Sequence, residues 1–263
     1  VSGDVTFTGN LGSFTTTVES GHTFTAAASV VDGKTINGSG NLTVSSLTEA
    51  VVVTNLGVTG ITTISGIANA SQITAIEAAN GSGTIVGTGL TEINGSASGI
   101  VQALTDLDTD PTTFDSTVSD AAAAAVLATD LSTIGAATSG TVTVTNAIAL
   151  SGSQAQLTAA LVTPASKVTA ATAVVTVNDA ADAAITATSL SAIGGATAGA
   201  VTVTNAVVIS GSASEVTGAL VTADTLVIAE TAKVTINDAN AVELDATVLS
   251  AIGDKTNGVV TVS

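Results

Sequence analysis

Short stretches of alternating apolar and polar residues recur along this chain. The clearest stretch, residues 201–204, reads VTVT and consists only of β-branched residues. Strict alternation of this kind is typical of a strand that is buried on one face. The pattern therefore predicts a strand with Val203 in the core and Thr202 facing solvent. Similar valine-centred stretches are found at Val142, Val175, Val234 and Val260.

Helical signals lie between these strands. Ser212 and Glu215 have the S-x-x-E/Q spacing of a capping box, in which two side chains satisfy free amides at a helix start. Apolar residues follow at helical spacing over residues 216–220, so a helix of two turns is expected there. A shorter signal lies at Leu190 and Ile193, where two apolar residues one turn apart precede Gly194, which can end a helical turn.

The whole pattern repeats. The phrase ATDLSTIGAATSGTVTVTNA begins at Ala128, returns as ATSLSAIGGATAGAVTVTNA at Ala187, and begins again at Ala246. Both intervals are 59 residues (187 − 128 and 246 − 187). A fixed period of this length indicates a repeat protein in which each unit packs against its neighbours.

The repeat predicts an all-β fold, namely an elongated parallel β-solenoid with a short helical turn in each coil. Each repeat carries two strand-rich coils, and parallel crossovers are right-handed by default. An all-β sandwich or a string of small β domains is the alternative. We expect two regions: residues 1–62, a divergent β-rich N-terminal segment, and residues 63–263, tandem repeats of about 59 residues that form the solenoid.

Composition narrows the possible partners. The chain has 21 acidic residues against four lysines and no arginine, for a net charge of −17. This charge argues against binding to nucleic acid, which depends on cationic side chains, and against adhesion to anionic lipid. The longest apolar run, residues 121–128, is too short to span a bilayer, so membrane insertion is not expected. Because the chain lacks an initiating methionine and stops within a repeat, we expect a fragment or a processed form.

The phrases ATxLSxIGxxTxGxVTVTNA and [IL]SGSxxxxTxALV resemble the tandem β-strand repeats of very large secreted bacterial proteins. Such repeats occur in cyanobacterial proteins, surface-layer proteins and adhesins. The resemblance covers about residues 63–263 and implies export, often with calcium, and a structural or adhesive role at the cell surface. The opening GDVTFTGN is also similar to β-rich shafts of phage fibres, which leaves a virion appendage as an alternative.

One acidic cluster is a candidate metal site. Asp106, Asp108 and Asp110 alternate along the segment TDLDTDPTTFDS, and Asp115 follows five residues later. Calcium accepts six to eight oxygen ligands at flexible geometry, so these four aspartates are the predicted calcium ligands. The spacing is not that of an EF-hand, because Pro111 stands where that loop has glycine. The competing interpretation is a solvated acidic insertion.

Two further patterns have a structural and a functional interpretation. Asn146 and Asn205 lie 59 residues apart, as do the pairs Asn178-Asp179 and Asn237-Asp238. Turn chemistry is the preferred explanation, with a cation between stacked aspartates as the alternative. Outward threonines over residues 143–145 and 202–204 form a T-x-T pattern that ice-binding solenoids use, although exposed threonine is also normal on any half-buried strand.

Catalysis and cofactor binding are not expected. His22 is the only histidine, and the chain has no cysteine to complete a nucleophile or a metal set. Tyrosine, tryptophan and arginine are absent, although enzymes that act on polysaccharides build their subsites from such residues. No catalytic or cofactor-binding residue is therefore predicted.

The sequence thus predicts a structural extracellular protein at the bacterial cell surface. It would be a section of a filament, surface layer or adhesin stalk that self-associates by stacking and lateral contacts. The alternatives are a ligand-binding module, either adhesive towards a surface glycan or ice-binding, and a phage fibre shaft. Calcium is the one cofactor considered.

Overall fold

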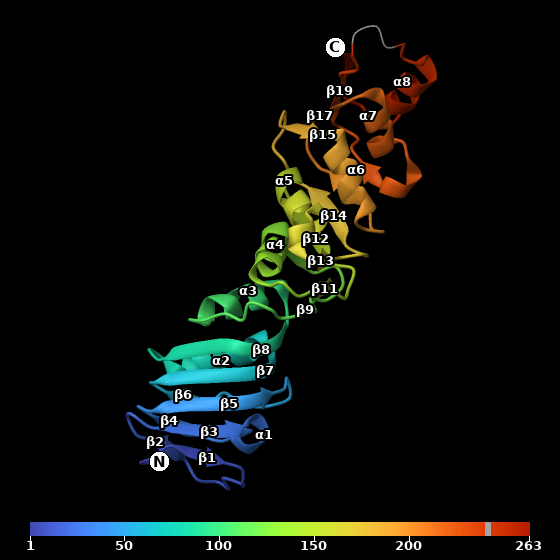
Figure 1. Cartoon of the computed structure of the whole chain (residues 1–263). Coiled ribbons are helices and arrows are strands. Elements are labelled where there is room, and N and C mark those ends of the chain that lie inside the picture. Colours follow the sequence, from blue (N-terminus) through green and yellow to red (C-terminus); the bar gives the residue numbers. More distant parts are fainter. Residues whose placement is uncertain (240–242) are drawn as a thin grey trace. The chain divides into compact units, whose positions relative to one another are not determined.

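The structure is a computed structural model, and it describes residues 1–239 and 243–263. The chain divides into two compact units, which are described separately (Figure 1). The first unit comprises Val1–Ser119 with Ala137–Val142, and the second comprises Asp120–Ala136 with Thr143–Ser263.

The first unit contains two parallel sheets and three helices. Its five-stranded sheet has the order β1-β3-β5-β7-β8 and its three-stranded sheet has the order β2-β4-β6. The strands are β1 (Val5–Phe7), β2 (Thr16–Val18), β3 (Thr23–Ala27), β4 (Ile36–Gly38), β5 (Asn41–Leu47), β6 (Leu56–Val58), β7 (Ile61–Asn69) and β8 (Thr84–Asn94). The helices are α1 (Ala28–Val31), α2 (Ala70–Asn80) and α3 (Ala97–Asp106).

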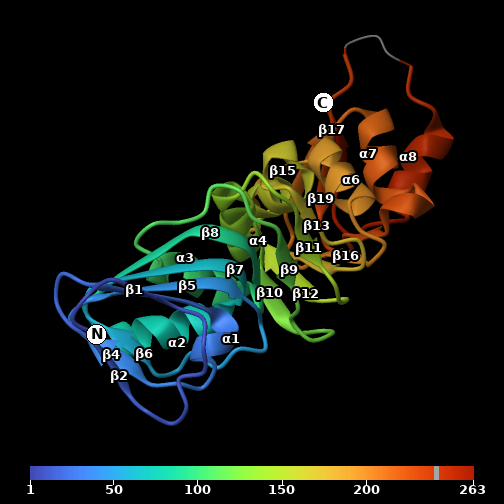
Figure 2. The same cartoon turned by 60° about the horizontal axis from the view of Figure 1, so that its bottom comes forward.

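The register of the five-stranded sheet places apolar residues of neighbouring strands opposite one another. Phe24 of β3 pairs with Val5 of β1 and with Leu42 of β5. Phe24 and Leu42 are almost fully buried, and the ring of Phe7 contacts that of Phe24 at a centroid distance of 6.1 Å. One face of the sheet therefore forms the core, and Figure 2 shows α1 and α2 on one side of its strands.

The second unit contains a five-stranded sheet, β10-β12-β14-β16-β18, and a four-stranded sheet, β15-β17-β19-β20, both parallel. These strands are β10 (Ala125–Leu127), β12 (Ala149–Gly152), β14 (Val174–Val177), β15 (Ala184–Thr186), β16 (Val201–Val203), β17 (Val208–Gly211), β18 (Val227–Ile228), β19 (Lys233–Ile236) and β20 (Val260–Val262). The remaining short strands of the chain are β9 (Ser116–Val118), β11 (Val142–Val144) and β13 (Val168–Thr169).

Helices alternate with these strands. They are α4 (Ala128–Ala137), α5 (Gln154–Leu157), α6 (Ala187–Gly195), α7 (Ala213–Leu220) and α8 (Ala246–Gly253). A π-helical turn (Thr158–Val162) and two 3-10 turns (Pro164–Ser166 and Ala223–Thr225) complete the regular structure. The helices α4, α6 and α8 begin at Ala128, Ala187 and Ala246, which are the positions at which the sequence repeat begins.

The predicted fold class is wrong. The sequence was expected to form an all-β elongated parallel β-solenoid, whereas the structure is an α/β protein and not a β-solenoid. Eight α-helices alternate with the strands of several parallel sheets over residues 1–239 and 243–263. Parallel pairing was expected correctly, but the helical share of the chain was underestimated.

Alanine explains much of this error. The segment ATSLSAIGG was expected to supply one short turn around Leu190 and Ile193, yet α6 extends over nine residues and buries Ala187 as well. Alanine has the highest helix propensity and adds a small apolar surface, so it lengthens helices that a count of large apolar residues misses. The helix predicted over residues 212–220 is confirmed, because Ser212 and Glu215 form a full capping box at the start of α7.

The division into residues 1–62 and 63–263 stays a prediction. It was drawn from sequence similarity between repeats, whereas the two compact units follow from contacts within the folded chain. No helix in the described part of the chain is both long and apolar enough to cross a bilayer.

The register of β16 gives the first testable prediction. Val203 is 4% exposed and Thr202 is half-buried, as the alternating pattern predicted. Val203→Asp should lower the free energy of unfolding by several kcal/mol, because it buries a carboxylate without a partner. Thr202→Asp should cost less than about 1 kcal/mol. Urea denaturation of both variants measures the difference, and equal losses would show that this strand is out of register.

Candidate functional site

Three of the four predicted calcium ligands accept hydrogen bonds from other segments of the protein. Asp106 ends α3, and its carboxylate accepts hydrogen bonds from Thr74 Oγ1 at 2.8 Å and from Gln102 Nε2 at 2.7 Å. The carboxylate of Asp108 accepts a hydrogen bond from the Ile85 amide at 2.8 Å. Both aspartates therefore tie neighbouring segments of the first unit together.

The other two aspartates lie in different surroundings. Asp115 Oδ1 accepts hydrogen bonds from the amide and the hydroxyl of Thr141, both at 2.8 Å, and these bonds lower the pKa of Asp115. Asp110 is exposed as a residue, and partial desolvation of its carboxyl group raises its pKa.

These positions do not form a metal centre in the structure. Within residues 1–239 and 243–263, no group of three or more histidine, cysteine, aspartate or glutamate side chains could hold a metal ion. Calcium binding by the four aspartates stays a prediction, and their arrangement gives it no support.

Glu77 is an acidic neighbour that sequence reasoning missed. It lies on α2, and partial burial raises the pKa of its carboxyl group, with further contributions from the charges of Asp106 and Asp108. Glu77 lies on α2, Asp106 ends α3 and Asp108 lies in the segment after α3, so their proximity follows from packing that the sequence pattern did not reveal.

The asparagine and aspartate side chains bind backbone groups at turns, which is the interpretation that the sequence analysis preferred. Asn205 Nδ2 donates to the carbonyl of Asp179 at 2.7 Å, and Asn146 makes the equivalent bond to the carbonyl of Asp120. The Asp179 carboxylate accepts from the Gln154 amide at 2.6 Å. One repeat later, the Asp238 carboxylate accepts from the Ala213 amide at 2.7 Å. These side chains therefore link each segment to the one before it.

Buried threonines form a second, more regular link that the sequence analysis did not identify. Thr197 is 7% exposed, and its hydroxyl donates to the carbonyl of Ala173 at 2.6 Å and accepts from the Gly199 amide at 3.1 Å. Thr138 and Thr256 make the same pair of bonds one repeat before and one repeat after. We call this arrangement the threonine clamp.

The clamp depends on a neighbouring glycine. A Cβ atom at Gly199 would lie 2.1 Å from the carbonyl oxygen of Ala173, and the same distance separates a Cβ at Gly258 from the carbonyl of Ala232. No side chain fits at such a separation, so T-x-G is the sequence signal of the clamp. The signal is visible at TSG, TAG and TNG, at residues 138–140, 197–199 and 256–258.

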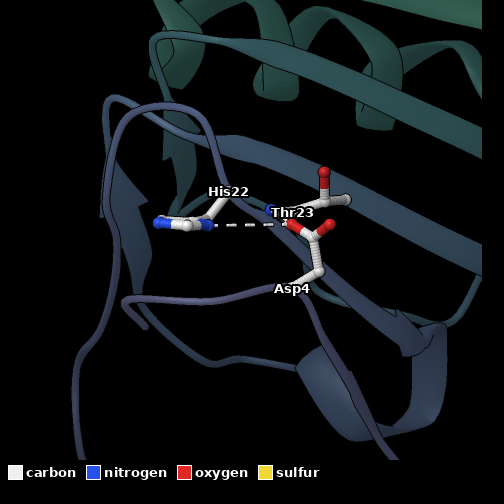
Figure 3. A network of polar contacts seen from close by, with 3 residues as sticks. All are labelled: Asp4, His22 and Thr23. Carbon is white, nitrogen blue, oxygen red and sulfur yellow. Dashed lines mark hydrogen bonds and ion pairs between the residues drawn. The ribbon is translucent and has the colours of Figure 1, made fainter.

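The single histidine takes part in a small polar network (Figure 3). His22 Nδ1 lies 3.9 Å from Asp4 Oδ1, which accepts a hydrogen bond from the Thr23 amide at 2.9 Å. The Asp4 carboxylate is 78% exposed, and the third member of the network contributes its backbone amide rather than a nucleophile. The network therefore fixes the start of β3, and the expectation that the chain is not an enzyme stays a prediction.

An open hollow in the second unit has a volume of about 630 Å³ and is lined by residues of α7 and the start of α8. Two of its carboxylates are already engaged in helix capping. Asp238 accepts from the amide of Ala213, the first residue of α7, and Asp245 caps α8 through the Thr247 amide. These two carboxylates in the hollow therefore already accept hydrogen bonds from backbone amides.

No protein-family model, no curated protein and no solved structure matches this chain. The resemblance to secreted bacterial repeat proteins therefore rests on the sequence phrases alone.

Glu77 gives a pH-dependent prediction. Its pKa in the folded protein is raised, so the ionised form is less stable in the folded than in the unfolded chain. Glu77→Gln should therefore raise the melting temperature at pH 7, and the gain should vanish below about pH 4, where the glutamate is protonated in both states. Glu230→Gln, at an exposed position, is the matched control. A gain that is equal at both pH values would contradict the prediction.

The calcium hypothesis makes a separate prediction. If Asp106, Asp108 and Asp110 bind calcium, a hundredfold excess over the dissociation constant should stabilise the chain by about 2.7 kcal/mol. The measurement compares the melting temperature in millimolar calcium and magnesium at matched ionic strength, in the parent and in the triple Asp→Asn variant. A gain that magnesium reproduces, or that survives the triple substitution, would identify screening of the acidic surface instead.

Proposed function

We propose that this chain is a structural module, a section of an extracellular bacterial surface protein that acts as a scaffold rather than as a catalyst. The observation that carries this proposal is the threonine clamp, which recurs at the repeat interval in Thr138, Thr197 and Thr256. The cell-surface location and the association of copies follow from the resemblance of the repeat phrases.

The clamp supports a mechanical role because it gives a hydrogen-bond partner to backbone groups where the chain turns. The carbonyl of Ala173 and the amide of Gly199 both bind the Thr197 hydroxyl instead of a strand neighbour. Buried backbone groups without a partner cost free energy, and one hydroxyl that serves both prevents that cost. Because the same threonine hydrogen bonds recur in each repeat, they fix the spacing of successive segments.

The asparagine and aspartate hydrogen bonds between segments reinforce this framework. Asn205 and Asp238 each join residues about 25 positions apart, so a stretched chain has to break several bonds together. A section of a stalk or filament needs to distribute a stretching force over several bonds in this way. No observation in the described residues favours a phage fibre shaft over a bacterial surface protein.

Single-molecule stretching tests the structural role. The chain contains no cysteine, so cysteines added at its two ends provide unique attachment points. We expect discrete force peaks. We also expect Thr197→Val to lower the peak force and to reduce the free energy of unfolding by about 1 to 3 kcal/mol, since the buried carbonyl of Ala173 and the partly buried amide of Gly199 lose their partner.

Thr202→Val is the matched control, because it makes the same chemical change on the outer side of β16. It should leave the force peaks unchanged. A parent chain that extends without any force peak would overturn the structural proposal. Sedimentation velocity at rising protein concentration tests self-association, and a chain that stays monomeric throughout would remove that part of the proposal.

A further inference from the structure

One sheet face in the first unit carries a row of threonines in register. Thr6 of β1 pairs with Thr25 of β3, which pairs with Thr43 of β5, which pairs with Thr63 of β7. Figure 1 shows β3, β5 and β7 lying one above another. The alternate residues in β3, β5 and the first half of β7 are buried, so the threonines occupy the outer side of the sheet.

A second row lies beside the first. Thr23 pairs with Asn41 and Ile61 pairs with Thr84, so a row of three polar residues and one exposed isoleucine lies two residues along these strands. We call the two rows together the hydroxyl face.

The hydroxyls of the central row are available to a ligand. Among the described residues, the side chains of Thr6, Thr25, Thr43 and Thr63 make no hydrogen bond to the protein, in contrast to the hydroxyls of the clamp threonines. A hydroxyl has one donor and two acceptor positions, so four such groups in a row present a regular array of both.

The central row of this face is also uncharged. The strand segments 5–7, 23–27, 41–45, 61–65 and 84–86 contain no charged residue, although the chain as a whole has a net charge of −17. The exposed carboxylate of Asp4 lies at the edge of the second row, where it accepts a hydrogen bond from the Thr23 amide. A ligand that matches the central row is therefore neutral. Nucleic acid and ionic surfaces do not fit, because their affinity depends on opposite charge.

The spacing of the rows matches one neutral ligand closely. Neighbouring strands lie about 4.8 Å apart. Water oxygens joined by a hydrogen bond lie about 2.75 Å apart, and tetrahedral bonding then places second neighbours in ice about 4.5 Å apart. Thr25, Thr43 and Thr63 thus repeat at nearly the interval at which oxygen atoms repeat in an ice lattice.

We propose that the hydroxyl face of the first unit is a binding surface for ice. Threonine hydroxyls would join the water lattice, and the threonine methyl groups together with Ile61 would exclude disordered water between them. This function goes beyond that of a scaffold and concerns a region in which the sequence alone showed only a divergent segment.

Ice affinity is the direct test. Fluorescently labelled parent protein should enter slowly grown polycrystalline ice and should slow the coarsening of ice grains in an annealed film. Thr25→Tyr with Thr43→Tyr places two rings over the centre of the face. It should raise the protein concentration needed for both effects by roughly tenfold or more, since blocking a central contact commonly costs over 1 kcal/mol.

Ser210→Tyr with Thr235→Tyr is the matched control, because these residues pair across β17 and β19 on the outer side of a sheet in the second unit and lie outside the T-x-T pattern of residues 202–204. The control should retain the parent activity, and circular dichroism near 4 °C should show that both variants are folded. Exclusion of the parent from ice, or equal losses in both variants, would overturn the proposal. Adsorption to microcrystalline cellulose without entry into ice would also overturn it.

Discussion

Parallel strand register is the constraint on which the other features of this protein depend. Each strand must pair its amides and carbonyls with segments about 20 to 30 residues away, as in the pairing of Val175 with both Leu150 and Val201. Once the register is fixed, side chains of the same kind align in rows. The 59-residue period keeps these rows uniform, because every second segment offers the same residue at the same place.

The ends of the strands are where this constraint is hardest to satisfy. There the backbone turns, and its polar groups lose their strand partners. Thr197, Asn205 and Asp179 each place a side-chain atom on such a group. This use of carboxylates gives part of the net charge of −17 a structural role. Several aspartates, among them Asp108 and Asp115, act as backbone acceptors and are held there by the segments that they join.

Local features of the fold could be predicted from the sequence, whereas its class could not. The alternation at residues 201–204 placed Val203 in the core, and the capping box at Ser212 located the start of α7. Both signals are confined to a few residues. The extent of α6 and the proximity of Glu77 to the charges of Asp106 and Asp108 depend on how segments pack, and a single alanine-rich phrase does not reveal that packing. Calcium binding by Asp106, Asp108, Asp110 and Asp115 stays a prediction.

Threonine shows why residue type alone could not identify a functional surface. Thr197 points into the fold, where its hydroxyl serves two backbone groups and is buried away from any ligand. Thr43 carries the same hydroxyl on the outer side of β5, where no protein group in the described residues binds it. The motif T-x-G marks the clamp threonines, but the phrase LTVS does not show on which side of the sheet Thr43 lies. Register decides it, so the same parallel pairing that requires the clamps also produces the free hydroxyl face.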